Sequence, residues 1–167
     1  VSENTIISVL DEEETKSAFV IVDLEGSANL ASTFAVSRAN LVLIPMQGSQ
    51  LDADQSKRVI NLIHREETVF RRKIPYAAYF TRTSTAIRPK DLGHIQASLK
   101  AAGVPVLPVE LTERAAFRAI MQLGGTVYDL MPSEVSNPDA AIENAEAFAS
   151  EVTRLLGAQT GNMEAAE

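Results

Sequence analysis

Short apolar runs alternate along this chain with segments of helical spacing. Runs rich in Val, Ile, Leu and aromatic residues predict buried strands at Ala18–Val22, Leu41–Met46, Pro75–Thr81 and Val104–Leu111. Helical spacing predicts helices over Asn29–Arg38, Asp52–Phe70, Pro89–Ala102, Glu113–Leu123 and Pro138–Leu156. This alternation is typical of an α/β fold with three layers, a mostly parallel sheet covered by helices on both faces.

Residues at the segment ends support these boundaries. Asp52 is suited to cap the first turn of its helix, and Gly103 to end the helix before it. The first 17 residues resemble the last turns of an amphipathic helix followed by an acidic loop. The final segment, 157–167, lacks apolar periodicity and predicts a disordered tail. We therefore expect one α/β domain over residues 1–156.

Composition excludes several kinds of site, and the charge distribution suggests a partner. The chain has no cysteine, which excludes disulfides, thiolate metal sites and cysteine nucleophiles. Its formal net charge is −7, but the charge is uneven. Residues 1–56 carry 2 Lys/Arg and 9 Asp/Glu, residues 57–100 carry 10 and 3, and residues 101–167 carry 3 and 10. A basic middle between acidic flanks predicts a local positive surface.

The first apolar run ends abruptly in two carboxylates and a glycine, Asp23, Glu25 and Gly26. Ligands of an open parallel sheet bind beyond the carboxyl ends of its strands. Asp23 would there hold a hydrated magnesium ion or orient a water, and Gly26 would let the backbone approach a phosphate. The alternative is that Asp23 only caps the next helix and Gly26 only makes a turn. Glu25 is either a water-positioning group or an exposed loop carboxylate.

A succession of segments resembles the ParA/MinD family of deviant P-loop ATPases. "FVIVDLEG" corresponds to a strand with its switch, and "ANLVLIPMQGSQLDADQ" to the next strand and helix. "YAAYFTRTSTAIRP" corresponds to a strand leading into a basic loop, and "VELTERAAFRAIMQLGGTVYDL" to the last strand and the segment after it. The resemblance covers roughly Phe19 to Leu130 in consistent order. It implies a P-loop NTPase-like fold, ATP and Mg²⁺ as cofactors, and ATP hydrolysis in the intact protein.

The resemblance also implies roles for individual residues. Asp23 matches the switch aspartate that acts on magnesium or its water shell, and so is the catalytic and metal candidate. Gly26 matches the turn that senses the γ-phosphate, and Pro45 lies beside the site. The positions that flank the adenine base are matched by Thr81, Arg82, Glu113 and Arg114.

Two departures from the family pattern concern the nucleotide. In the family, the phosphates of the nucleotide lie on a glycine loop that contains a lysine. No glycine in this sequence is followed by lysine. The sequence thus resembles the C-terminal two-thirds of such a protein, or a relative that has lost the site, and we expect no ATPase activity from this chain itself. "DLEG" also replaces the usual Asp-x-Pro switch.

The basic middle is a candidate DNA surface. Family members active in partition bind DNA non-specifically as ATP-bound dimers, and the matching basic residues are Arg71, Arg72, Lys73, Arg88 and Lys90. Such binding weakens steeply with salt because it releases counterions. The alternative is a solvated helix face, since Glu66 and Glu67 are able to pair with neighbouring cations.

The leading hypothesis is therefore an ATP-switched protein for plasmid or chromosome partition. It implies an ATP-bound homodimer, non-specific DNA, a ParB-like adaptor, no membrane, and a cytoplasmic location on the nucleoid or plasmid. A nucleotide-free interaction domain that keeps the fold and the partner surface is the alternative. An ATP-dependent ligase on the same fold is the third, although no cluster of polar residues suggests its substrate pocket.

Overall fold

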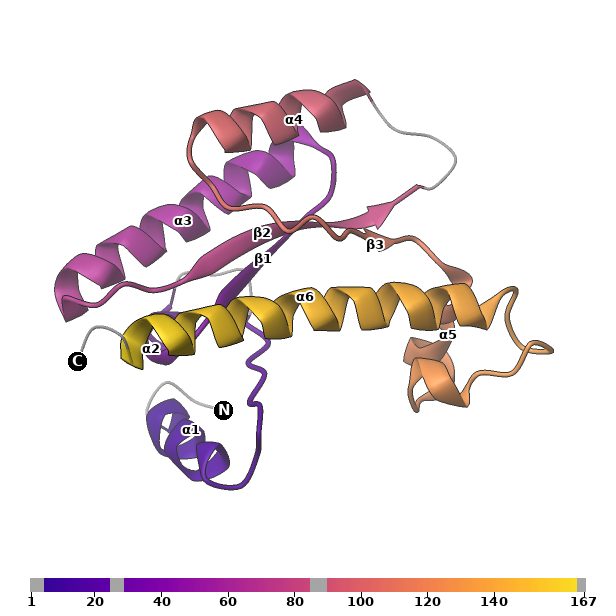
Figure 1. The fold of residues 1–167 in the computed structure, drawn as a ribbon, viewed down its shortest axis with the longest axis horizontal. Coiled ribbons are helices and arrows are strands. Elements are labelled where there is room, and N and C mark those ends of the chain that lie inside the picture. Colours follow the sequence, from indigo (N-terminus) through magenta and orange to yellow (C-terminus); the bar gives the residue numbers. More distant parts are fainter. Residues whose placement is uncertain (1–4, 25–28, 85–89, 165–167) are drawn as a thin grey trace. The chain divides into compact units, whose positions relative to one another are not determined.

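The computed structural model describes residues 5–24, 29–84 and 90–164 (Figure 1). Its elements, in chain order, are α1 (Ile6–Glu14), α2 (Leu30–Arg38), β1 (Val42–Met46), α3 (Gln50–Phe70), β2 (Tyr76–Thr83), α4 (Lys90–Ala101), β3 (Leu111–Thr112), α5 (Ala115–Leu123), the 3₁₀ helix η1 (Val127–Asp129) and α6 (Pro138–Glu164). The chain divides into two compact units, one of Val1–Val42 with Lys57–Tyr76 and the other of Leu43–Ser56 with Ala77–Glu167.

A parallel three-stranded sheet in the order β1-β2-β3 confirms the predicted α/β fold. β2 is central, and its Phe80 and Ala78 are fully buried. Tyr79, on the other face of the strand, contacts the ring of Phe148 on α6 at 4.8 Å between centroids. In Figure 1, β2 and β3 lie between α4 and α6. The sheet is therefore covered on both faces.

The strand predicted at Ala18–Val22 is absent from the structure. Residues 17–24 have no regular secondary structure, and Phe19 and Ile21 are 63% and 92% exposed. Strand propensity depends on pairing and burial, and this segment is exposed and is not one of the three strands of the described sheet. The prediction of a buried strand here is wrong for that reason.

The last predicted strand is much shorter than expected. Val104–Leu111 contributes an isolated parallel bridge between Ala78 and Val106, and regular β3 comprises only Leu111 and Thr112. Pro105 and Pro108 lack the N–H group that a continuous ladder requires, so the segment pairs only at intervals.

Two helix boundaries differ clearly from the predictions, and a third agrees. α3 begins at Gln50, and the Ser49 hydroxyl, rather than Asp52, caps it by accepting the Asp52 N–H at 3.2 Å. α6 continues to Glu164, into the segment predicted as a tail, despite Gly157 and Gly161, which disfavour helix. Gly103, with φ of 69°, follows α4 as predicted, and Val104 N–H donates to Leu99 C=O at 2.9 Å.

The Asn144 side chain of α6 occupies the outer edge of the sheet at β3. Its amide donates to Glu110 C=O at 2.8 Å, and its oxygen accepts the Thr112 N–H and the Thr112 hydroxyl, both at 2.9 Å. One side chain thereby satisfies the two backbone groups that a further strand would otherwise take. It holds α6 to the carboxyl end of β3.

Replacing Asn144 with alanine is expected to lower the free energy of unfolding by about 1 to 3 kcal/mol, because half-buried backbone groups lose their partners. Urea unfolding measures this change. Asn144→Asp, which keeps the acceptor but removes the donor to Glu110, should also destabilise the protein. Unchanged unfolding of both variants would contradict this role.

Candidate functional site

The carboxyl ends of β2 and β3 lie side by side. Thr81 is in register with Leu111, and Thr83 with Thr112. Glu113 N–H then donates to Thr83 C=O at 2.9 Å, so the chain leaving β3 stays against the end of β2. The predicted adenine-flanking residues, Thr81, Arg82, Glu113 and Arg114, are therefore gathered at one edge of the sheet. This is the edge at which open parallel sheets bind ligands.

The backbone at this edge departs from a regular strand. The β2–β3 register shifts between Thr81 and Thr83, and Arg82 between them has φ of 54°. A residue with a β-carbon in the left-handed region costs about 1 to 3 kcal/mol, and such strain is concentrated at functional sites. The irregularity is therefore consistent with a binding site at Arg82.

Three charged side chains are clustered at the same edge. Glu113 lies 3.9 Å from the Arg82 guanidinium and also pairs with Arg118 of α5. All three side chains are substantially exposed, so these ion pairs contribute little to stability. Because two arginines share one carboxylate, the cluster keeps a positive charge.

Two buried polar atoms at this edge find no hydrogen-bond partner among the residues that the structure describes. They are the hydroxyl oxygen of Thr83, a residue that is only 8% exposed, and the Nε of Arg114. An unsatisfied buried polar group costs about 1 to 3 kcal/mol, so it calls for an explanation such as a ligand. Thr83 was not predicted as a site residue, although it stands two residues after Thr81 in "TRT".

The N-terminus of α5 adds further hydrogen-bond donors. Arg114 is its N-cap residue, in extended conformation, and its side chain makes no capping hydrogen bond. The first turn holds no acidic residue. The first N–H groups of a helix lack intrahelical partners and carry partial positive charge. With Thr83 and Arg114, they give the site an excess of donors.

Of the other three predicted nucleotide residues, the structure describes two. Pro45 is an exposed residue of β1 in the same compact unit as Thr81. Asp23 is exposed in the irregular segment after α1, in the other unit. Gly26 lies outside the described residues. Within the described ranges, no three Asp, Glu or His side chains are close enough to hold a metal ion.

The structure distinguishes among the predicted DNA-binding residues. Arg71, just past α3, is exposed and has no ion-pair partner within residues 5–24, 29–84 and 90–164. Lys73 is 92% exposed and lies 3.4 Å from Glu67. Arg72 instead donates to Ser37 C=O at 2.9 Å and to Ala39 C=O at 2.6 Å, which stabilises the end of α2. Arg88 lies outside the described residues, and Lys90 is the first residue of α4.

Glu67 stabilises the turn that carries these basic residues. Its carboxylate accepts the backbone N–H of buried Ile74 at 3.0 Å and also pairs with Lys73. The Ile74 hydrogen bond, with smaller contributions from Lys73 and His64, lowers the pKa of Glu67 below its ordinary value of 4.5. A carboxylate with a lowered pKa stabilises the fold above that ordinary value.

We expect the stability advantage of the natural protein over Glu67→Gln to be greatest near neutral pH. It should disappear as the pH falls through and below 4.5, because the Glu67 carboxylate then becomes protonated in both the folded and the unfolded state. Urea midpoints of both proteins at several pH values check this. A constant difference down to acidic pH would contradict it.

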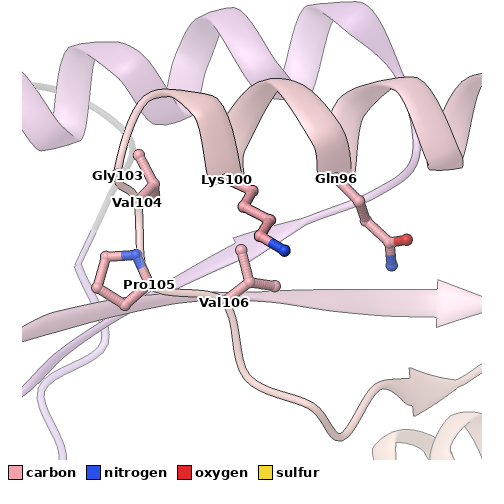
Figure 2. A pocket seen from close by; sticks show the side chains of 6 residues that line it. All are labelled: Gln96, Lys100, Gly103, Val104, Pro105 and Val106. Carbon is pink, nitrogen blue, oxygen red and sulfur yellow. The ribbon is translucent and has the colours of Figure 1, made fainter.

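A separate open hollow lies between the end of α4 and the segment before β3. Val104, Pro105 and Val106 line its apolar side, while Gln96 and Lys100 extend from α4 toward Val106 (Figure 2). None of the residues predicted to bind nucleotide or DNA lines it. No helix of the described ranges has the length and apolar character needed to cross a membrane.

Comparison with known proteins identifies a relative that matches nearly the whole chain. The protein named "Protein ParA" from Rhizobium radiobacter is 42% identical over 156 residues. The match covers 93% of this chain and 70% of the relative. No family model matches the chain.

Proposed function

Because this chain belongs to the ParA family, we propose that it acts in DNA partition and that its state is set by ATP. The observation that carries the proposal is the pair of unsatisfied buried groups, the Thr83 hydroxyl and Arg114 Nε, at the carboxyl ends of β2 and β3. A bound nucleotide offers acceptors on its base and ribose that would satisfy them.

The residues present fit the base end of a nucleotide better than its phosphate end. Thr81, Arg82 and Glu113 would border the base, with Thr83 and Arg114 donating to it or to the ribose. Asp23 would act on magnesium or its water shell, Gly26 would respond to the γ-phosphate, and Pro45 would lie beside them. ATP would supply a hydrolysable phosphate and so a reversible switch. The phosphate loop of the family is not found in this sequence.

Exposed cations support the DNA part of the proposal. Arg71 and Lys73 lie in the turn after α3, and both side chains are exposed, although Lys73 also pairs with Glu67. They are the leading candidates to contact phosphates, with Arg88 and Lys90 as further candidates. The proposal includes an ATP-bound homodimer, a ParB-like adaptor, and a cytoplasmic location on a nucleoid or plasmid. The name of the Rhizobium radiobacter relative supports a role in partition.

The direct test is titration with a fluorescent ATP analogue and magnesium. It is made on this chain and on the full translation product of its gene, and DNA retention is measured with and without ATP. Saturable binding by the full product, together with ATP-dependent DNA retention, is expected. Binding by neither protein would contradict the proposal and would favour a nucleotide-free interaction domain.

A further inference from the structure

The hollow beside α4 lies at an open part of the outer edge of the described sheet. Ala78 of β2 donates its N–H to Pro105 C=O and accepts the Leu107 N–H, both at 2.8 Å. In a parallel pairing of this kind, the residue between the two bonded ones directs its own N–H and C=O away from the neighbouring strand. That residue is Val106, and neither of these groups has a partner among the residues that the structure describes. Val106 therefore offers one donor and one acceptor to a further extended chain.

The edge beyond Val106 is closed. Pro108 is the next residue whose N–H would point outward, and it has none. Further along, the Asn144 side chain occupies the Glu110 C=O and the Thr112 N–H. A partner strand that continued along this edge would therefore lose hydrogen bonds, whereas a chain that ends beside Val106 would not. The open part of the edge is suited to a chain terminus.

The hollow adds an apolar wall and a positive charge. It has a volume of about 380 Å³, and Val104, Pro105 and Val106 form its apolar side. Lys100 and Gln96 extend from α4 toward Val106 (Figure 2). Lys100 is exposed, and no carboxylate within residues 5–24, 29–84 and 90–164 pairs with it. Its ammonium group is thus available to an anion bound beside Val106.

We propose that this hollow binds the carboxyl terminus of an extended, apolar peptide segment of a partner protein. The peptide backbone pairs with the N–H and C=O of Val106, its apolar side chains lie against Pro105 and Val106, and its terminal carboxylate binds Lys100. This inference goes beyond the proposed function, because none of the residues predicted to bind nucleotide or DNA lines the hollow.

Each part of the site selects one property of this ligand. The backbone groups of Val106 require an extended chain, the apolar wall requires an apolar side chain, and the Lys100 ammonium requires an anion. A phosphate group of DNA would meet only the ammonium. A small carboxylate would leave the backbone groups of Val106 unpaired. The carboxyl terminus of a peptide is the occupant that uses all three parts.

The experiment uses the fluorescein-labelled hexapeptide Gly-Ser-Thr-Val-Ile-Val with a free terminal carboxylate, and the same peptide with a terminal amide. Fluorescence anisotropy measures binding to the full translation product without nucleotide. Lys100→Met is expected to weaken binding of the free-carboxylate peptide at least about tenfold, because a hydrogen bond to a charged group is lost. The amide peptide should bind as weakly to the natural protein, and Lys100→Met should not weaken it further.

The matched control is Lys57→Met, which makes the same substitution at an exposed lysine of α3. It should leave peptide binding unchanged. The proposal is overturned by equal affinity for the two peptides, by equal weakening in the two variants, or by no binding below about 1 mM. Pentanoate, a small carboxylate, tests the other occupant. If it displaced the peptide at an equal concentration, the hollow would be a small-carboxylate site and the proposal would also be overturned.

Discussion

Replacing Phe80 with alanine is expected to lower the free energy of unfolding by about 3 to 5 kcal/mol. Phe80 is fully buried on the central strand of the sheet, so its removal leaves a cavity that neighbouring side chains fill only in part. Since domains are stable by about 5 to 15 kcal/mol, this loss is a large share of the total. The urea midpoint measures it, provided that the dependence on urea concentration is unchanged.

Phe19→Ala is the matched control, because it makes the same substitution at a side chain that is 63% exposed. Its effect should be within about 0.5 kcal/mol. A loss as large as that of Phe80→Ala would show that Phe19 is buried in solution. Such a result would restore the buried strand expected from the sequence.

Reversing two exposed charges in the turn after α3 is expected to abolish most DNA binding. Arg71→Glu/Lys73→Glu should weaken non-specific binding by at least about tenfold at 0.1 M salt, because two phosphate contacts are replaced by repulsion. The slope of log affinity against log salt should become shallower by about 2. Fluorescence anisotropy with a labelled duplex, in the presence of ATP, measures both quantities on the full translation product.

Lys16→Glu/Arg154→Glu is the control for net charge, since it changes the charge of the protein by the same amount just after α1 and on α6. It should retain most of the DNA binding. Arg72 is left intact in both variants because it stabilises the end of α2. Equal loss in the two double variants would show a general charge effect and would contradict a DNA surface at this turn.

Helices and strands were predicted correctly where the hydrophobic periodicity and the residues at the ends of the segment indicated the same element. β1 and β2 are strands as expected, and α2 begins after the Asn29 cap, which accepts the Ser32 N–H at 2.8 Å. The apolar run at Ala18–Val22 did not become a strand, because composition does not determine whether a strand has a neighbour to pair with. The proline interruptions before β3 similarly limited its length.

The candidate site was predicted only in part. The resemblance placed Thr81, Arg82, Glu113 and Arg114 together, and the strand register brings them to one edge. Thr83 could not be recognised beforehand, because its significance lies in a buried hydroxyl without a partner, which depends on the surrounding packing. Likewise, the hydrogen bonds of Arg72 to two backbone carbonyls depend on tertiary structure. The amino-acid sequence alone therefore did not show that Arg72 has a structural role that Arg71 lacks.

The most direct test of nucleotide binding at the ends of β2 and β3 is the affinity of Thr83→Val for the fluorescent ATP analogue with magnesium, measured on the full translation product. Valine keeps the shape of the side chain but removes the unsatisfied hydroxyl, so stability should be unchanged or higher. We predict an affinity about 2- to 10-fold lower than that of the natural protein, the loss of one hydrogen bond. Equal affinity in the two proteins would contradict the account.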